Sequence, residues 1–171
     1  MRLASALVAA FTALGRRAAA VPADGFWRDA SIRLEHGRTD ADAYRTAWLD
    51  TQALAREVLD PLGPDGDRRY LPALRDPVTN RSARVPYRTA AVDGVVLVAG
   101  AFLLGGHLDF DVTIHLALDA AARARRTPAD QAWTLPAWDA YDREVRPGDR
   151  ADVAVRWNDA DHPAIGIRNP G

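Results

Sequence analysis

The chain contains neither cysteine nor lysine among its 171 residues. Without cysteine, disulfide bonds, thiolate nucleophiles and cysteine-ligated metal sites are excluded. All 22 basic residues are therefore arginine, and the compact ammonium charge that many phosphate-binding sites use is missing. The absence of cysteine is compatible with the reducing cytoplasm, where we expect this protein to act.

Long apolar runs and a strong net charge are also missing. No apolar run approaches the roughly 20 residues that a membrane-spanning helix needs. The net charge is −1, with 48% hydrophobic and 26% charged residues, which is ordinary for a soluble globular protein. This balance gives no electrostatic reason to expect nucleic acid or a membrane surface as a partner. The length predicts a single domain spanning 1–171.

The N-terminal segment allows two interpretations. Apolar residues 3–14 follow Arg2, and Ala18–Ala20 resembles a signal-peptide cleavage site. Against a signal peptide, Arg16 and Arg17 place two positive charges after the apolar stretch. The alternative is an amphipathic helix that ends at Gly15, followed by a short strand near 18–21.

A continuous β-branched run, Val95–Val98, marks the centre of the chain. Such a run is typical of a strand covered on both faces, as in a parallel sheet. Gly100 follows it, a second apolar run occupies 111–117, and a helix pattern capped by Asp119 continues to Arg126. Because ligands of open α/β sheets bind at the carboxyl ends of strands, we expect the functional site near 99–104.

The remaining segments complete an α/β pattern. Residues 40–59 predict one helix, with Asp40 as its N-cap, and the Pro- and Gly-rich stretch 61–66 ends it. The arginine-rich stretch of about 60–90 has little periodicity, and its length suggests a functional excursion. A helix near 137–145 and a strand at 152–157 follow. The polar stretch 158–171 is predicted to be a tail.

Several ordered pieces together resemble uridine kinase-like proteins of the actinobacterial kind, within the P-loop NTPases. No single piece is specific, but their order and spacing cover nearly the whole chain. They are Asp24–Arg28, Gly37–Asp40, Trp48–Asp50, Leu59–Pro64, Arg69–Pro72, Asp76–Thr79, Val95–Leu104, Arg125–Pro128, Trp133–Pro136 and Ala151–Val153.

The resemblance implies a three-layer P-loop NTPase-like fold, with a mostly parallel sheet and flanking helices. It also implies phosphoryl transfer from ATP, with Mg²⁺, to the 5′-hydroxyl of a nucleoside. The phosphate-binding pattern GxxxxGK[ST] does not occur, and residues 1–7 resemble the helix that follows it in the family. We therefore expect a fold that lacks the first strand and phosphate loop, truncated before that helix. The slot between the strands near Ala18 and Val95 should then be left open or be filled by rearrangement.

The resemblance also assigns roles to individual residues. Asp24 corresponds to the carboxylate that accepts the proton of the substrate hydroxyl. Predicted substrate-binding residues are Phe26, Arg28, Asp50, Tyr70, Asp76 and Arg81. Predicted phosphate-binding residues are Arg123, Arg125 and Arg126. A turn aspartate, an exposed helix aspartate and a solvated arginine face are the corresponding structural alternatives for Asp24, Asp50 and the arginines.

The predicted metal site is weakened, because the family's acidic residue at the end of the 95–98 strand is Ala99 here. A methyl group cannot ligate Mg²⁺, so no metal ligand is assigned and catalysis should be weak or absent. A protein that binds a nucleotide or a partner without catalysis is the first alternative, and an exported α/β protein is the second. His115 has no metal-ligand spacing and is read as a strand residue. Trp133, Trp138 and Tyr141 are predicted to pack against other residues and not to form a base-stacking platform.

Overall fold

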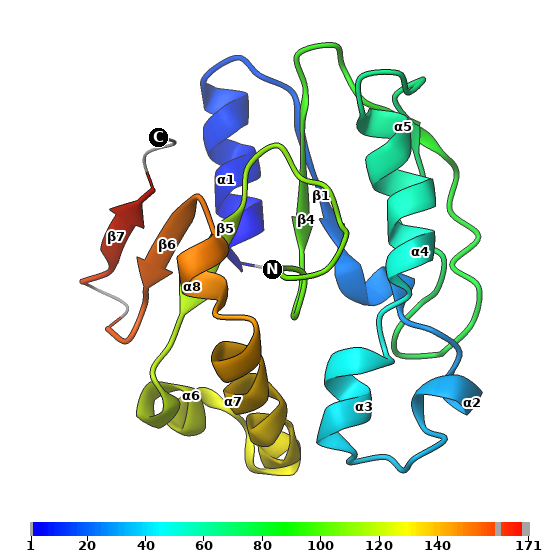
Figure 1. The fold of residues 1–171 in the computed structure, drawn as a ribbon. Coiled ribbons are helices and arrows are strands. Elements are labelled where there is room, and N and C mark those ends of the chain that lie inside the picture. Colours follow the sequence, from blue (N-terminus) through cyan, green and yellow to red (C-terminus); the bar gives the residue numbers. More distant parts are fainter. Residues whose placement is uncertain (1, 160–161, 169–171) are drawn as a thin grey trace. The chain divides into compact units, whose positions relative to one another are not determined.

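A computed structural model describes residues 2–159 and 162–168 (Figure 1). The chain divides into two compact units by contact density. The first unit comprises Met1–Arg33 and Ala47–Ala101, and the second comprises Leu34–Thr46 and Phe102–Gly171. This division reflects only where contacts within the chain are dense. It does not test whether residues 1–171 form a single domain, which stays a prediction.

The first unit is built on two parallel strands, β1 (Ala18–Pro22) and β4 (Val95–Ala99). They pair directly, from Ala18 opposite Val95 to Pro22 opposite Ala99. Of the two predicted outcomes, an open slot between these strands is therefore wrong, and direct pairing closes it. The backbone N–H and C=O groups of two adjacent apolar strands need partners, and each strand supplies them to the other.

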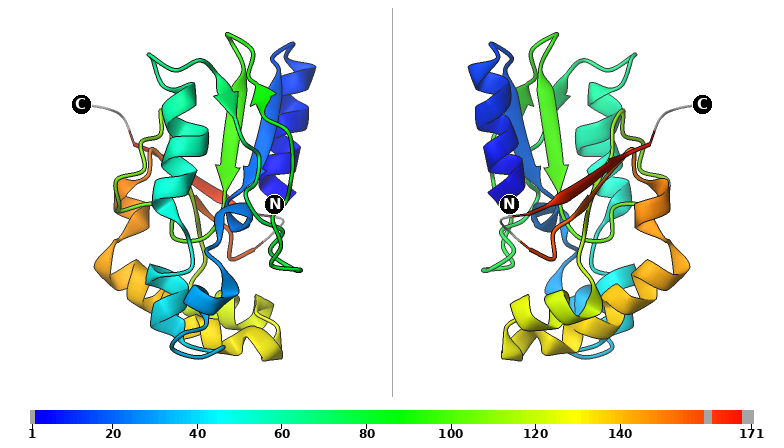
Figure 2. Two further views of the ribbon diagram at one scale, coloured as in Figure 1. Left: turned by 90° about the vertical axis from the view of Figure 1, so that its right-hand side faces the viewer. Right: turned by 90° about the vertical axis from the view of Figure 1, so that its left-hand side faces the viewer.

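Helices cover both faces of this strand pair (Figure 2). Helix α1 (Arg2–Ala13) packs against β1 and β4 and buries Ala4, which confirms the helix-and-strand interpretation of the N-terminal segment. The other face is covered by a continuous helical rod of α4 (Thr51–Leu54), the π-helical turn η2 (Ala55–Leu59) and α5 (Asp60–Leu62). The largest fully buried side chains are Val21, Phe26, Leu54 and Val58.

The single helix predicted over 40–59 is wrong, because the structure has two helices there. Helix α3 (Ala41–Thr46) belongs to the second unit, and its Ala43 N–H is capped by the Asp40 side chain. The chain then extends, with the Arg28 N–H donating to the Trp48 carbonyl, before Asp50 caps α4 through the Ala53 N–H. A second N-cap inside a helical pattern favours a break over a continuous helix.

Short elements connect the main ones in the first unit. The 3₁₀ turn η1 (Ala23–Phe26) follows β1, and α2 (Ala30–Arg33) comes shortly after it. The excursion contains the two-residue strands β2 (Arg69–Tyr70) and β3 (Arg88–Thr89), which pair antiparallel. Helix α5 ends at Leu62, where the Pro- and Gly-rich stretch was predicted to end the helix.

The second unit has its own three-stranded sheet. Strand β5 (Ile114–Ala117) pairs parallel with β6 (Val153–Arg156), which pairs antiparallel with β7 (Ala164–Ile167). Strand β7 lies within the stretch 158–171 that was predicted to be a polar tail, and the sequence analysis did not predict this strand. The short apolar run Ala164–Ile167 supplies the alternation that pairs with β6, although Pro163 precedes it and Gly166 interrupts it.

Helices α6 (Ala120–Arg126), η3 (Ala129–Thr134), α7 (Leu135–Glu144) and α8 (Pro147–Arg150) complete the second unit. Asp119 caps α6 through the Ala122 N–H, as predicted. An aromatic cluster joins α3 to α7, with ring centroids 4.5–5.5 Å apart. Its members are Tyr44, Phe102, Trp133, Trp138 and Tyr141, so the predicted packing role of the last three is confirmed.

The architecture is mixed α/β with parallel strand pairs and flanking helices, which confirms the predicted fold class. Across residues 2–159 and 162–168, no helix is long and apolar enough to cross a membrane.

Candidate functional site

The carboxyl ends of β1 and β4 form the rim on which the candidate site is built. Pro22 and Ala99 are paired as the last residues of the two strands. Gly100 then passes so close to η1 that a Cβ built on it would lie 2.4 Å from the Cβ of Ala23. Only glycine allows this approach, which fixes the start of η1 beside the end of β4.

Asp24 lies in η1, two residues after the end of β1, and is partly exposed. Its backbone carbonyl accepts a hydrogen bond from the Trp27 N–H. Its carboxylate has no hydrogen bond or ion pair within the part of the chain that the structure describes. The carboxylate is therefore available to a ligand at this rim, as a general base must be.

A cation–aromatic cluster supports the chain that leaves this rim. The Trp27 and Trp48 rings meet edge to face with centroids 5.2 Å apart. Arg33 is 7% exposed, and the Cζ of its guanidinium lies 5.1 Å and 4.7 Å from the centroids of the Trp27 and Trp48 rings. Its Nε donates to the Arg28 carbonyl, and burial lowers the Arg33 pKa. Sequence reasoning missed Arg33, since it is one arginine among many and only the fold brings both tryptophans onto it.

The segment 74–84 is anchored beside Asp24. The N–H groups of Leu74 and Arg75 both donate to the Gly25 carbonyl, and a Cβ on Gly25 would lie 2.9 Å from the Cβ of Ala73. The Arg75 guanidinium forms an ion pair with Asp29 at 3.1 Å. Hydrogen bonds from the Ser31 N–H and hydroxyl, with the charge of Arg75, lower the pKa of Asp29.

Asn80 fixes the same segment from its far side, since its side-chain oxygen accepts from the Ala30 N–H. Neither Asn80 nor Asp29 was among the predicted site residues. The adjacent sequence Asp29-Ala-Ser31 is a turn signature that could have identified the local bond from the Ser31 N–H to Asp29. The long-range partners carry no such signal.

The six predicted substrate-binding residues have different surroundings. Phe26 is fully buried and Tyr70 is 3% exposed, so both side chains pack in the core. The carboxylate of Asp50 caps α4, and that of Asp76 accepts from the Val78 and Thr79 N–H groups. These contacts give four of the six a structural role, and their substrate contacts stay predictions.

Arg28 and Arg81 differ from the other four. Arg28 is half-buried, and its Nε has no hydrogen-bond partner among the described residues. Arg81 is exposed, and its side chain makes no hydrogen bond or ion pair in the same part of the chain. The Arg81 guanidinium thus retains its donors for a ligand, whereas the Nε of Arg28 is unpaired but buried.

The rim offers little to a metal ion. Ala99 ends β4, and Asp93 lies before the start of that strand, at its opposite end. Among residues 2–159 and 162–168, no cluster of three His, Cys, Asp or Glu side chains could hold a metal. A hard cation such as Mg²⁺ needs several oxygen ligands, and the described side chains do not supply that set.

The predicted phosphate-binding arginines all belong to α6 in the second unit. Arg123 is 9% exposed, forms ion pairs with Asp139 and Asp142, and donates to the Leu118 carbonyl. Arg126 donates to the Asn158 carbonyl. Arg125 is exposed and makes no ion pair with a described residue. Arg123 is thus committed to the structure, and Arg125 retains its donors for a phosphate.

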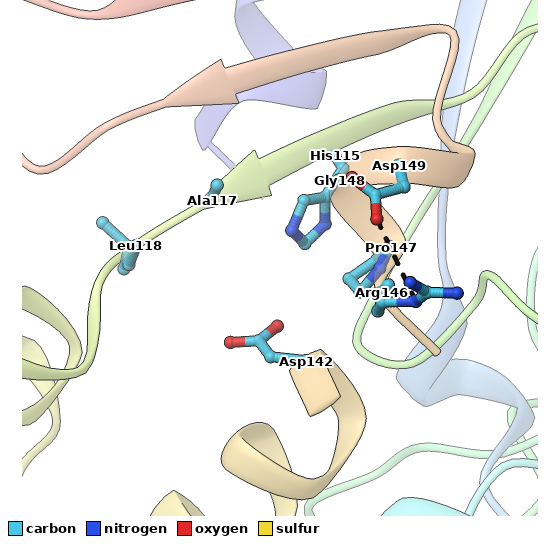
Figure 3. Close-up of a pocket in the computed structure, with 8 residues that line it drawn as sticks. All are labelled: His115, Ala117, Leu118, Asp142, Arg146, Pro147, Gly148 and Asp149. Carbon is cyan, nitrogen blue, oxygen red and sulfur yellow. Dashed lines mark ion pairs between the residues drawn. The ribbon is translucent and has the colours of Figure 1, made fainter. Parts of the chain in front are cut away.

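The second unit also contains a pocket of about 280 Å³ beside β5 and α8 (Figure 3). His115, confirmed as a strand residue, faces Asp142 across it, and burial lowers the His115 pKa. Asp142 forms an ion pair with Arg123, and the Nε of Arg146 lies 4.0 Å from the Oδ2 of Asp149. The charges that line the pocket are thus balanced internally, and none of them requires a ligand.

Comparison with known proteins shows the fold. No protein-family model and no curated protein sequence matches the chain. Among solved structures, the chain is similar to a possible uridine kinase from Bacillus stearothermophilus, with a TM-score of 0.69. The two chains are 20% identical, and the match covers 90% of this chain and 79% of the other. The chain therefore shares the α/β fold of that structure.

Proposed function

We propose that the protein binds a nucleoside at the carboxyl ends of β1 and β4, and that Asp24 accepts the proton of its 5′-hydroxyl during slow phosphoryl transfer from ATP. The observation that carries the proposal is the unpartnered carboxylate of Asp24 at this rim. The similarity to a possible uridine kinase supports the choice of substrate class. Ligands of α/β sheets bind at this edge.

The residues around the rim can position the nucleoside hydroxyl, but they offer little electrostatic stabilisation to the transferring phosphoryl group. Asp24 can hold the hydroxyl proton, and the Nε of Arg28 is buried without a hydrogen-bond partner among the described residues. Ala99 and the absence of lysine leave the transferring phosphoryl group without two of its usual partners. Each missing contact of this kind typically lowers the rate by roughly 10²–10³-fold, so transfer should be slow. The phosphate-binding role predicted for Arg125, which is exposed on α6 and makes no ion pair with a described residue, stays a separate proposal.

A second candidate function is nucleoside binding without catalysis. Ala99 favours it, because the described residues supply no ligand set for Mg²⁺. The two functions differ in one measurement, the Mg²⁺-dependent consumption of ATP in the presence of a nucleoside. ATP and Mg²⁺ are cofactors of the first function only.

The testing experiment compares Asp24→Asn with the matched control Asp93→Asn. Asp93 is an exposed aspartate at the other end of β4. Calorimetry would measure uridine binding, and a coupled assay would measure ATP turnover. We expect uridine to bind the wild type and both variants similarly, while Asp24→Asn lowers turnover by at least about 10²-fold.

The outcomes separate the candidates. Turnover that survives Asp24→Asn rejects the assigned base. Uridine binding without any turnover in the wild type supports binding alone. Absence of binding for every nucleoside tested rejects both functions.

A further inference from the structure

The excursion contains a strongly basic surface that the proposed function does not use. Residues 68–88 contain six arginines and one acidic residue. Five of the arginines are exposed. Two of these, Arg81 and Arg84, line a hollow of about 470 Å³ together with Ser82.

The backbone under this hollow is held by an ordered set of hydrogen bonds. The Ala83 N–H donates to the Leu74 carbonyl, and the Asp76 N–H donates to the Arg81 carbonyl. Arg75 and Ser82 form an antiparallel bridge between these two bonds. These backbone contacts make residues 74–83 a short hydrogen-bonded hairpin, which fixes the backbone positions of Arg81 and Arg84.

The side-chain donors that line the hollow are exposed to solvent. The side chains of Arg81, Ser82 and Arg84 make no hydrogen bond or ion pair with any residue that the structure describes. The acidic residue in the segment, Asp76, already accepts from the N–H groups of Val78 and Thr79, and these bonds lower its pKa. The positive charge of the hollow is thus not neutralised by a described ion pair.

The backbone at the hollow is also unusual. Arg84 has φ +48° and Asn80 has φ +57°, which is the left-handed region that side chains seldom adopt. Non-glycine residues held in this region concentrate at ligand sites, where the surrounding bonds maintain the strain. Here Arg84 is itself one of the strained residues, and Asn80 directly precedes Arg81.

We propose that Arg81, Ser82 and Arg84 form a binding site for an oxyanion group, a phosphate or a carboxylate. A guanidinium binds either group through paired N–H donors, and a serine hydroxyl adds a third donor. The site is independent of Asp24 and of phosphoryl transfer. It makes the preferred ligand of this surface an anionic molecule.

The test is a titration of the full-length ¹⁵N-labelled protein with inorganic phosphate at constant ionic strength, followed by amide chemical shifts. We expect saturable shifts at residues 80–85, with a Kd of about 1 mM, as for a small exposed anion site. A parallel titration with acetate identifies the source. Tighter phosphate binding indicates a phosphoryl ligand, and tighter acetate binding indicates a carboxylate ligand.

Variants separate the site from general charge attraction. Arg81→Gln and Arg84→Gln should each weaken phosphate binding by about 5–10-fold. Arg81→Lys should weaken it nearly as much, because lysine keeps the charge but not the paired donors. The matched control is Arg88→Gln, which removes an exposed arginine of β3 outside the hollow and should leave the Kd unchanged.

Each other outcome overturns the inference. It fails if the shifts do not saturate, or if they saturate away from residues 80–85. It also fails if Arg88→Gln weakens binding as much as Arg81→Gln does. Amide chemical shifts that stay unchanged outside residues 80–85 confirm that each variant folds. We expect this result because the side chains of Arg81 and Arg84 make no hydrogen bond or ion pair with a described residue.

Discussion

Gly100→Ala tests the close approach that forms the rim of the site. A methyl group at this position would lie 2.4 Å from the Cβ of Ala23 and 3.6 Å from its Cα. Ordinary carbon contacts begin near 3.4 Å, so the end of β4 and the start of η1 must separate by about 1 Å. Ala23 is 2% exposed and lies between the fully buried Val21 and Phe26, which leaves it little room.

We expect Gly100→Ala to lower the free energy of unfolding of the first unit by about 1–3 kcal/mol, the usual cost of overpacking a buried contact. Urea unfolding followed by tryptophan fluorescence reports on both units, through Trp27 and Trp48 in the first and through Trp133, Trp138 and Trp157 in the second. Gly106→Ala is the control, because a Cβ there would meet nothing within 4 Å. It should be neutral or stabilise by up to about 1 kcal/mol.

A second substitution shows whether the Ala23 methyl is the cause. In Gly100→Ala/Ala23→Gly the overlapping carbon is gone, and the nearest atom of residue 23 is the Cα at 3.6 Å. The double-mutant cycle should give a favourable coupling of about 1–2 kcal/mol. A Gly100→Ala protein as stable as Gly106→Ala, or a coupling near zero, would refute the reasoning.

Three further predictions concern single side chains. Arg123→Met should lower the free energy of unfolding in urea by about 2 kcal/mol, because it leaves Asp142 and Asp139 without their buried partner. The control Arg125→Met replaces an exposed arginine and should change this free energy by less than about 0.5 kcal/mol. Asp50→Ala should cost about 1 kcal/mol through the lost cap of α4, whereas Asp50→Asn should retain stability, and a loss of uridine binding in Asp50→Asn would show that this carboxylate also contacts the sugar. Burial lowers the pKa of His115, so the folded state binds fewer protons than the unfolded state. The free energy of unfolding should therefore fall as the pH drops through the ordinary histidine value of 6.5. His115→Gln should remove this part of the pH dependence, and an unchanged pH profile of stability would contradict the prediction.

The α/β pattern was predictable because apolar periodicity and caps are local. The β-branched run became β4, Asp119 became the cap of α6, and Gly15 follows the end of α1 with φ +78°. The break in the predicted 40–59 helix depends on long-range pairing of 26–28 with 48–50, which periodicity does not reveal. Strand β7 was missed for a related reason, because a four-residue edge strand next to proline forms only against β6.

The site was predictable in part. The position of Asp24 after a strand followed from the sequence and a family resemblance, and the fold places it at the strand ends. The roles of Asp50 and Asp76 could not be separated in advance, because capping and ligand binding use the same carboxylate oxygens. The stacking of Arg33 on two tryptophans, and the anchoring of 74–84 on Gly25, arise only from tertiary contacts.

The most direct test of the central claim is a titration of the ¹⁵N-labelled full-length chain with uridine. Binding at the carboxyl ends of β1 and β4 predicts saturable amide shifts concentrated at residues 23–28 and 99–101, with the control variant Asp93→Asn behaving as wild type. Shifts confined to residues of the second unit, or none at any uridine concentration, would contradict the proposed nucleoside site.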